Sequence, residues 1–191
     1  FIKTKDELDI PNIQFHYAPA MIVDHGRTLL WGTGMSCHSC LLRPKSLGEV
    51  TLASADPFAD PLIDPKFLSH PDDMKDMIDG YKVMMRVLGS EPFSKYITEH
   101  TQRPIDINND ADIEQAMREG ADTVYHPVGT CKMGDDDMSV VDSRLKVHKL
   151  NGLRIVDASI MPTIVGGNTN APTIMIGEKA SDMILEDWNI H

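Results

Sequence analysis

The sequence predicts an α+β fold in which a mostly antiparallel sheet carries packed helices. Residues 12–23 alternate apolar with polar side chains, which is the period of a half-buried strand. Residues 71–88 instead place their apolar side chains on one stripe of a helix. Glycine and proline recur between such segments, as short strands joined by turns require. At 191 residues the chain can bury a core, as one large domain or two small ones.

The predicted strands occupy the first third of the chain. The strand over residues 12–23 places His16 on its polar side. Residues 26–34 are a glycine-punctuated segment with an apolar centre, which predicts another strand or a loop at a sheet edge. Residues 41–52 predict a strand, a turn and a further strand. Residues 56–64 are rich in Asp-Pro, and proline confines such a segment to the edge of a sheet or to an extended connection. We interpret its acidic residues as turn formers in preference to cation ligands.

A long helix is predicted over residues 71–88. His70 or the serine before it caps this helix, and Pro71 lies in the first turn. Asp72 and Asp73 face the positive end of the helix dipole. The predicted inward stripe consists of Met74, Met77, Ile78, Tyr81, Met84, Met85 and Leu88. Although methionines also occur on adaptable binding surfaces, we interpret this stripe as a core-facing one.

Shorter helices follow the long one. Residues 91–100 predict a brief helix, and residues 109–119 predict another with Ile113, Ala116 and Met117 turned inward. We find no internal repeat and no low-complexity segment between them. These helices complete the α+β unit.

Composition excludes several classes of partner. The net charge of −11 argues against nucleic acid and against an anionic membrane surface, because both favour clustered Lys and Arg. No apolar run approaches the roughly 20 residues of a membrane-spanning helix, so membrane spanning is not expected. Three cysteines do not make a disulfide framework, and reduced thiols in a cytoplasmic protein are the expectation.

Cys37 and Cys40 form a Cys-x-x-Cys pair, which is half of a typical zinc site. A second close pair is missing from the sequence, because Cys131 stands alone. We therefore interpret the two thiols as packed within a sheet, with redox chemistry and a metal site as alternatives, and we assign no metal.

The segment 125–134 reads Tyr-His-Pro-Val-Gly-Thr-Cys-Lys-Met-Gly. Pro127 biases His126 toward an extended backbone, and Gly129 and Gly134 permit turns that other residues resist. Such a segment can present a titratable imidazole to a cleft. A histidine that is merely hydrogen-bonded within a loop has the same sequence signature, so the segment alone leaves both interpretations open.

The last third of the chain returns to regular structure. Residues 140–147 are predicted to be extended, and residues 153–158 predict a strand buried on both faces, as in a parallel sheet. Residues 159–170 have no periodicity. Residues 171–188 predict the last helix, with Asn170 or the preceding threonine as its cap. The first two turns of this helix are apolar all round, which predicts that they are buried, and its amino terminus is a ready anion site.

Several separated motifs share one order and spacing. They are Leu-Arg-Pro-x-Ser-x-Gly-x-Val at 42–50, Pro-Leu-Ile-Asp-Pro at 61–65, His-Pro-x-Gly-Thr at 126–130, Val-Val-Asp at 140–142, Leu-Arg-x-Val-Asp-Ala-Ser at 153–159 and Gly-Asn-x-Asn-Ala-Pro-Thr-Ile-Met-Ile at 167–176. This set resembles the glucose-methanol-choline (GMC) oxidoreductases, a family of flavoproteins. The resemblance spans most of the chain and is closest to the choline dehydrogenase and alcohol dehydrogenase branch.

The resemblance implies oxidation of an alcohol to an aldehyde by hydride transfer to N5 of FAD. His126 matches the active-site histidine of the family, and an imidazole suits a group that takes the hydroxyl proton. Asn168 matches a second active-site position, which is His or Asn in the family. It cannot act as a base, but it can hold an alkoxide-like oxygen by hydrogen bonding.

The resemblance also implies a set of cofactor contacts. The helix that starts near Ala171 would direct its positive end toward the N1–C2=O edge of the flavin. The positions matching cofactor-binding segments of the family are Asp157, Ala158, Asn170, Pro172 and Thr173. For the two asparagines 168 and 170, loop and cap chemistry is the alternative interpretation.

The resemblance divides the chain into two parts. Residues 1–120 match a portion of the substrate-binding domain, and residues 121–191 match the catalytic loop with the last strand and helix of the FAD-binding domain. The sequence contains no Gly-x-Gly-x-x-Gly turn for dinucleotide binding. It also begins at Phe1, without Met or a signal peptide, which indicates either a piece of a longer protein or removal of a tag. We therefore expect the partner to be an amino-terminal FAD-binding portion of the same protein, and we expect this piece alone to be inactive and to bind FAD weakly.

Two functions of other classes compete with this interpretation. One is a stand-alone ligand-binding module that kept the fold without catalysis. The other is a small metal-binding protein that uses Cys37, His38 and Cys40. If choline is the substrate, an aromatic cage around its cation is required, and Tyr125 and Trp31 are the candidates.

Overall fold

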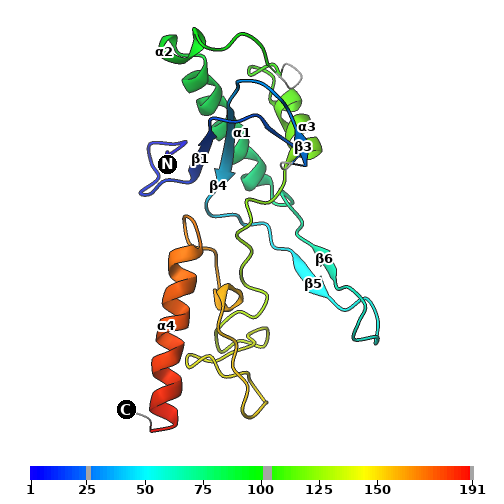
Figure 1. Ribbon diagram of the computed structural model, residues 1–191, viewed down its shortest axis with the longest axis vertical. Coiled ribbons are helices and arrows are strands. Elements are labelled where there is room, and N and C mark those ends of the chain that lie inside the picture. The colour runs from blue at the N-terminus through cyan, green and yellow to red at the C-terminus, as the bar shows by residue number, and fades with distance from the viewer. Residues whose placement is uncertain (25–26, 101–104, 190–191) are drawn as a thin grey trace. The chain divides into compact units, whose positions relative to one another are not determined.

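The computed structural model describes residues 1–24, 27–100 and 105–189. The chain forms two compact units, shown in Figure 1. Unit 1 comprises Phe1–Gly48 and Pro65–Val124, and unit 2 comprises Glu49–Asp64 and Tyr125–His191. The division predicted after residue 120 differs from this one by a few residues and by the segment 49–64. Assignment of the units to domains of an enzyme stays a prediction.

The described strands pair as three small antiparallel sheets. The strands are β1 (Ile13–Ala18), β2 (Ile22–Val23), β3 (Thr28–Leu29), β4 (Ser36–Leu41), β5 (Glu49–Thr51) and β6 (Leu62–Asp64). Strand β1 pairs with β4, β2 with β3, and β5 with β6. The predicted strand at 26–34 corresponds in part to β3, while residues 25 and 26 lie outside the described residues.

The described helices are α1 (Pro71–Leu88), α2 (Glu91–Ser94), α3 (Asp110–Gly120), the short 3₁₀ helix η2 (Ala158–Ile160) and α4 (Asn170–Asp187). Three of them, α1, α3 and α4, begin and end close to the predicted residues, whereas the helix predicted over 91–100 ends at Ser94 and η2 was not predicted. His70 caps α1, since its side chain accepts a hydrogen bond from the backbone N–H of Asp72. Asn109 caps α3 in the same way through Ala111 and Asp112. Together with the antiparallel strands, these helices confirm the predicted α+β class.

The core of unit 1 lies between α1 and α3. Met74 and Ile78 of α1 pack against Ile113 and Met117 of α3, which confirms part of the predicted stripe. The opposite side of α1 approaches β1 at Gly80, where an added Cβ would lie 2.9 Å from Cγ1 of Ile13. A glycine at this position therefore permits the close approach of helix and strand.

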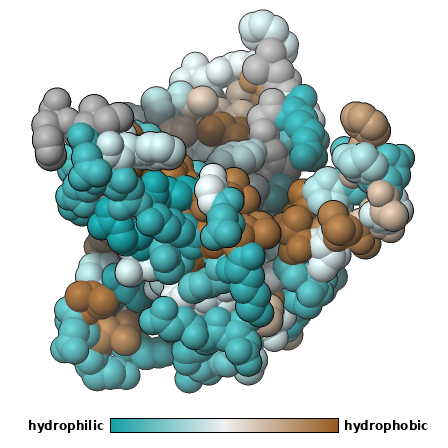
Figure 2. All heavy atoms as spheres, turned by 90° about the horizontal axis from the view of Figure 1, so that it is seen from below, coloured by the Kyte–Doolittle hydropathy of each residue, from teal (hydrophilic) through white to brown (hydrophobic). Residues whose placement is uncertain are grey.

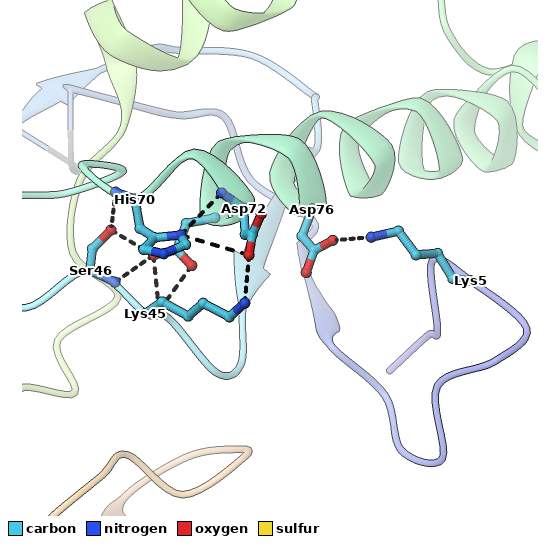
Figure 3. A network of polar contacts seen from close by, with 7 residues as sticks. Lys5, Lys45, Ser46, His70, Asp72 and Asp76 are labelled. Carbon is cyan, nitrogen blue, oxygen red and sulfur yellow. Dashed lines mark hydrogen bonds and ion pairs between the residues drawn. The ribbon is translucent and has the colours of Figure 1, made fainter.

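Asp73 joins the amino terminus of α1 to the preceding loop. Its carboxylate is 3% exposed and accepts hydrogen bonds from the backbone N–H groups of Lys45 (2.9 Å) and Ser46 (2.8 Å) and from Ser46 Oγ (2.6 Å). Ser46 Oγ in turn accepts from the backbone N–H of His70. Figure 3 shows Lys45, Ser46 and His70 gathered at this helix end. Sequence reasoning assigned Asp73 only to the helix dipole and missed this role.

The core of unit 2 lies between α4 and the irregular segment that precedes it, which runs beside the helix in Figure 1. Ile176 and Ala180 of α4 pack against four buried residues of that segment, Val141, Leu145, Ile160 and Met161. Backbone hydrogen bonds hold the segment together, including those of Met133 N to Ile160 O and Gly134 N to Val141 O. The segment thus forms a packed surface without regular strands.

The strand predicted over residues 153–158 is wrong for this chain. Only Arg154 forms a bridge, antiparallel to Lys146, and Leu153 and Val156 are exposed. A buried strand of a parallel sheet needs hydrogen-bonded neighbours on both sides. The described residues do not provide such neighbours on both sides of this segment, so Leu153 and Val156 remain at the surface while Ile155 packs against the core of unit 2.

The predicted burial of the first turns of α4 is also wrong for this chain. Ile174 is 59% exposed and Met175 is 57% exposed, whereas Ile176 is buried. The helix buries one face only, because the described part of unit 2 packs against it from one side. Periodicity could not reveal this, since a helix end that is apolar all round has no preferred face.

Apolar side chains also reach the surface on the hairpin of β5 and β6. Val50, Phe58, Leu62 and Ile63 are all exposed. Figure 2 shows apolar patches of this kind among hydrophilic residues on the face in view. The turn between the strands contains Asp56, whose Oδ1 accepts a hydrogen bond from the N–H of Phe58, so this aspartate has the predicted turn role. Within the described residues, no helix has both the length and the apolar character needed to cross a membrane.

Two carboxylates hold the carboxyl end of α4, and Glu186 contributes an ion pair with Arg144 at 3.2 Å. Asp187 forms ion pairs with Arg144 (2.8 Å), Lys146 (2.6 Å) and Arg154. Lys146 first, and then Arg154 and Arg144, hold the pKa of Asp187 well below its ordinary value of 3.8. These cations also offset the unfavourable position of an acidic residue at the negative end of the helix dipole.

We expect the last turn of α4 to loosen in acid. A carboxylate whose pKa is lowered by folding contributes stability above its unfolded pKa, and this contribution is lost as the pH falls. Hydrogen exchange at the amides of the last turn should therefore accelerate below about pH 4 in the full-length protein. Asp187→Asn should show fast exchange at all pH values, whereas Asp182→Asn, at an exposed site on the same helix, should behave as the wild type. Equal protection in Asp187→Asn and wild type would contradict this role.

Candidate functional site

The segment that carries His126 bends sharply on both sides of the histidine. Tyr125 has a φ of +64° and Gly129 has a φ of +88°. A left-handed backbone is strained for tyrosine and costs on the order of 1–3 kcal/mol, so the surroundings must hold it. Downstream, Cys131 N donates to Ser159 O and Met133 N donates to Ile160 O, which anchors the segment on the core of unit 2.

Both ring nitrogens of His126 have partners. Nδ1 lies 2.9 Å from Thr169 Oγ1, and Nε2 lies 3.0 Å from Nδ2 of Asn168. An amide nitrogen can only donate, so Nε2 is the acceptor in this arrangement. Nδ1 then carries the ring proton and donates a hydrogen bond to Thr169 Oγ1. The structure thus brings together the two predicted catalytic residues, His126 and Asn168, and adds Thr169.

Thr169 is the residue that sequence reasoning missed in this role. It is 8% exposed and precedes the first residue of α4 as its cap, but its side chain makes no capping hydrogen bond. A capping side chain bonds the N–H of the second or third helical residue, and the third here is Pro172, which has no N–H. A threonine three residues before a proline at a helix start was the available signal that its hydroxyl is free for another partner.

The predicted cofactor positions at the start of α4 lie near this cluster in the chain. Asn170 is the first residue of the helix and is exposed. Thr173 Oγ1 donates to Thr169 O at 2.7 Å, which fixes the backbone of the cap residue. Pro172 is partly buried. The exposed apolar side chains of Ile174 and Met175 adjoin these polar groups.

The other two predicted cofactor positions lie before η2. Asp157 Oδ1 accepts a hydrogen bond from the N–H of Ser159 at 2.7 Å, which caps η2. Ala158 is partly buried against the core of unit 2. The carboxylate of Asp157 is exposed, so it is accessible to a ligand from solvent.

Cys37 and Cys40 both lie on β4, as predicted for thiols packed in a sheet. Burial raises the pKa of both thiols, which disfavours the thiolate that redox chemistry or a metal requires. Residues three apart on a strand also point to opposite faces. Among the residues that the structure describes, no group of three His, Cys, Asp or Glu side chains could hold a metal ion.

Residues 44–177 match the profile of the GMC oxidoreductase family, which is more than half of the chain. The chain belongs to the GMC oxidoreductase family. It is 47% identical over 185 residues to an alcohol dehydrogenase (acceptor) of Pseudomonas putida, a match that covers 97% of this chain and 34% of that protein. It is 42% identical over 184 residues to an oxygen-dependent choline dehydrogenase of Klebsiella pneumoniae subsp. pneumoniae, covering 96% of this chain and 33% of that protein.

Solved structures of GMC oxidoreductases share the fold. A formate oxidase of Aspergillus oryzae RIB40 superposes with a TM-score of 0.89 at 29% identity, over 96% of this chain and 33% of that one. This chain therefore spans about a third of the length of the relatives it matches. Members of the family use FAD, and this chain corresponds to their carboxy-terminal portion.

Proposed function

We propose that this chain is the carboxy-terminal portion of an FAD-dependent dehydrogenase that oxidises an alcohol, choline-like or another primary alcohol, to the aldehyde. The pairing of His126 with Asn168 at 3.0 Å carries the proposal. It places a proton acceptor, the imidazole, beside a hydrogen-bond donor, the amide. A hydroxyl that is being oxidised needs both, one to take its proton and one to stabilise its oxygen.

The two side chains have complementary roles toward the substrate. When an alcohol binds, the Asn168 amide gives up its direct hydrogen bond to Nε2 of His126. The hydroxyl then donates to Nε2 of His126 and accepts from Nδ2 of Asn168. His126 Nε2 removes the hydroxyl proton as the carbon loses its hydride. The Asn168 amide then donates to an oxygen that is gaining negative charge, so its hydrogen bond is stronger in the transition state than in the ground state.

The start of α4 fits the flavin that the family uses. The first N–H groups of a helix have no acceptor within the helix, and they attract negative charge. The exposed side chains of Ile174 and Met175 provide an apolar surface of the kind an aromatic ring system covers. FAD, when bound, supplies the hydride acceptor. Asn170, Pro172 and Thr173 would hold the flavin at the helix start, and Asp157 and Ala158 would hold its ribityl and phosphate region.

We further propose that the amino-terminal FAD-binding portion of the same protein is the partner of this chain and that the protein is cytoplasmic. The coverage of about a third of each relative supports the first point. The three unpaired cysteines support a reducing compartment. Tyr125 and Trp31, the candidates for a choline cage, are both exposed but belong to different units, and their role stays a prediction.

The test is anaerobic reduction of the native full-length protein by alcohols. We expect a flavin spectrum that bleaches when a primary alcohol such as choline, ethanol or benzyl alcohol is added, and that recovers with an artificial electron acceptor. This chain alone, mixed with FAD, should give no turnover, because most of the dinucleotide site is supplied by the partner portion. A native protein without flavin would contradict the proposal and favour a binding module on the same fold.

A further inference from the structure

We propose that Thr169 is a positioning residue, which holds the imidazole of His126 with its proton on Nδ1 and its lone pair on Nε2. This inference rests on the proposed role of His126 as the proton acceptor. Thr169 itself touches neither the substrate oxygen nor the reacting carbon in this arrangement. It acts through the histidine ring.

The geometry requires both ring partners. Thr169 Oγ1 is 2.9 Å from Nδ1, and Asn168 Nδ2 is 3.0 Å from Nε2, on the opposite side of the ring. Two hydrogen bonds on opposite sides fix the plane of the ring and its rotation about the Cβ–Cγ bond. Since Thr169 is almost fully buried, water does not readily replace its hydroxyl as the partner of Nδ1.

The hydroxyl of Thr169 is available to His126 because it does not cap α4. Threonine is a favoured helix cap because its oxygen accepts from helical N–H groups. Thr169 instead has a helical backbone (φ −89°, ψ −6°) and no capping hydrogen bond from its side chain. The carbonyl of Thr169 is held by Thr173, through Thr173 N at 3.0 Å and Thr173 Oγ1 at 2.7 Å. Removing the Thr169 hydroxyl therefore removes a contact to His126 without removing a cap of α4.

The chemistry of a hydroxyl suits a base that must gain and lose a proton. When Nε2 takes the substrate proton, Nδ1–H still donates to Thr169 and its bond strengthens, because the ring is then charged. Both recorded partners of the ring, Thr169 and Asn168, are uncharged. They orient the ring without the strong attraction that a carboxylate would exert on the protonated form. Thr169 thus holds the ring with its proton on Nδ1 and its lone pair on Nε2 before each turnover.

The experiment compares three variants in the full-length flavoprotein. Thr169→Val keeps the shape and removes the hydroxyl, Thr169→Ser keeps the hydroxyl, and Thr163→Val makes the matched change at an exposed position of the same loop. The limiting rate of flavin reduction by a saturating alcohol is measured across pH, together with the FAD content of each variant. The expected loss for Thr169→Val is about tenfold to a hundredfold, as for other hydrogen bonds to groups that become charged.

The pH profile separates positioning from packing. Loss of the acceptor at Nδ1 destabilises the imidazolium, so Thr169→Val should lower the apparent pKa of the base in the rate profile. Thr169→Ser should stay within about threefold of the wild type, with an unshifted profile. Thr163→Val should match the wild type. A wild-type rate in Thr169→Val, an unshifted profile, or an equal loss in the valine and serine variants would overturn the proposal.

A second readout does not depend on activity. In the full-length protein labelled with ¹⁵N-histidine, the ring nitrogens of His126, assigned by their loss in His126→Gln, should show a protonated Nδ1 and an unprotonated Nε2. In Thr169→Val both neutral tautomers should be populated, so that each ring nitrogen is protonated part of the time. A protonated Nε2 in the wild type would overturn the inference. If instead His126→Gln reduces its flavin at the wild-type rate, the proposed function fails, and this outcome is distinct from failure of Thr169 alone.

Discussion

Replacing His126 with alanine in the full-length protein is expected to slow flavin reduction by about 10²- to 10⁴-fold, the range that a positioned general base contributes. FAD should remain bound, because the proposed cofactor contacts lie at the start of α4 and before η2, and alanine at position 126 leaves both in place. The ring of His126 contacts Asn168 and Thr169 through its two nitrogens, so alanine removes the base and both hydrogen bonds.

Stopped-flow reduction by a saturating alcohol measures this effect, with flavin absorbance as the check on cofactor content. His38→Ala is the matched control, since His38 is exposed on β4 and opposes His16 in the sheet with β1. It should reduce its flavin at the wild-type rate. Reduction of the His126 variant within about threefold of the wild type would remove His126 from the mechanism.

Replacing Asp73 with alanine should have the largest effect on stability, about 3–5 kcal/mol. Its buried carboxylate satisfies two backbone N–H groups and one hydroxyl from the loop before β5, through part-buried hydrogen bonds. Hydrogen bonds to a charged group contribute about 1.5–3 kcal/mol each, and part-buried donors recover some of this from water. Losing three of them at one helix end should release the loop from α1.

Hydrogen exchange at the amides of Lys45 and Ser46 in the full-length protein measures this release directly. Both amides should lose protection in Asp73→Ala, along with a lower temperature of unfolding. Asp76→Ala is the control on the same helix, because Asp76 forms a partly exposed ion pair with Lys5, shown in Figure 3, and such pairs contribute less than about 1 kcal/mol. Unchanged protection of both amides in Asp73→Ala would show that the carboxylate does not hold the loop.

The sequence alone located α1, α3 and α4 well. Capping residues marked the helix starts, at His70, at Asn109 and at Thr169 or Asn170. The apolar period identified the core residues Met74, Ile78, Ile113 and Met117. Capping and amphipathic period depend on residues a few positions apart, so a single sequence contains them in full. Asn168 was recognised only through the resemblance to the GMC family, since an asparagine in a glycine-rich loop has no signature of its own.

The tertiary structure decided what depends on distant residues. Thr169 reaches His126 across 43 positions of the chain, and Asp73 reaches Lys45 across 28. No local rule relates such pairs, because a side chain chooses its partner only after the backbone has brought the two together. The same reason explains the two wrong predictions. Pairing of residues 153–158 as a strand depends on the segments that lie beside them, and not on their own apolar sequence. Burial of Ile174 and Met175 likewise depends on what packs against that face of α4.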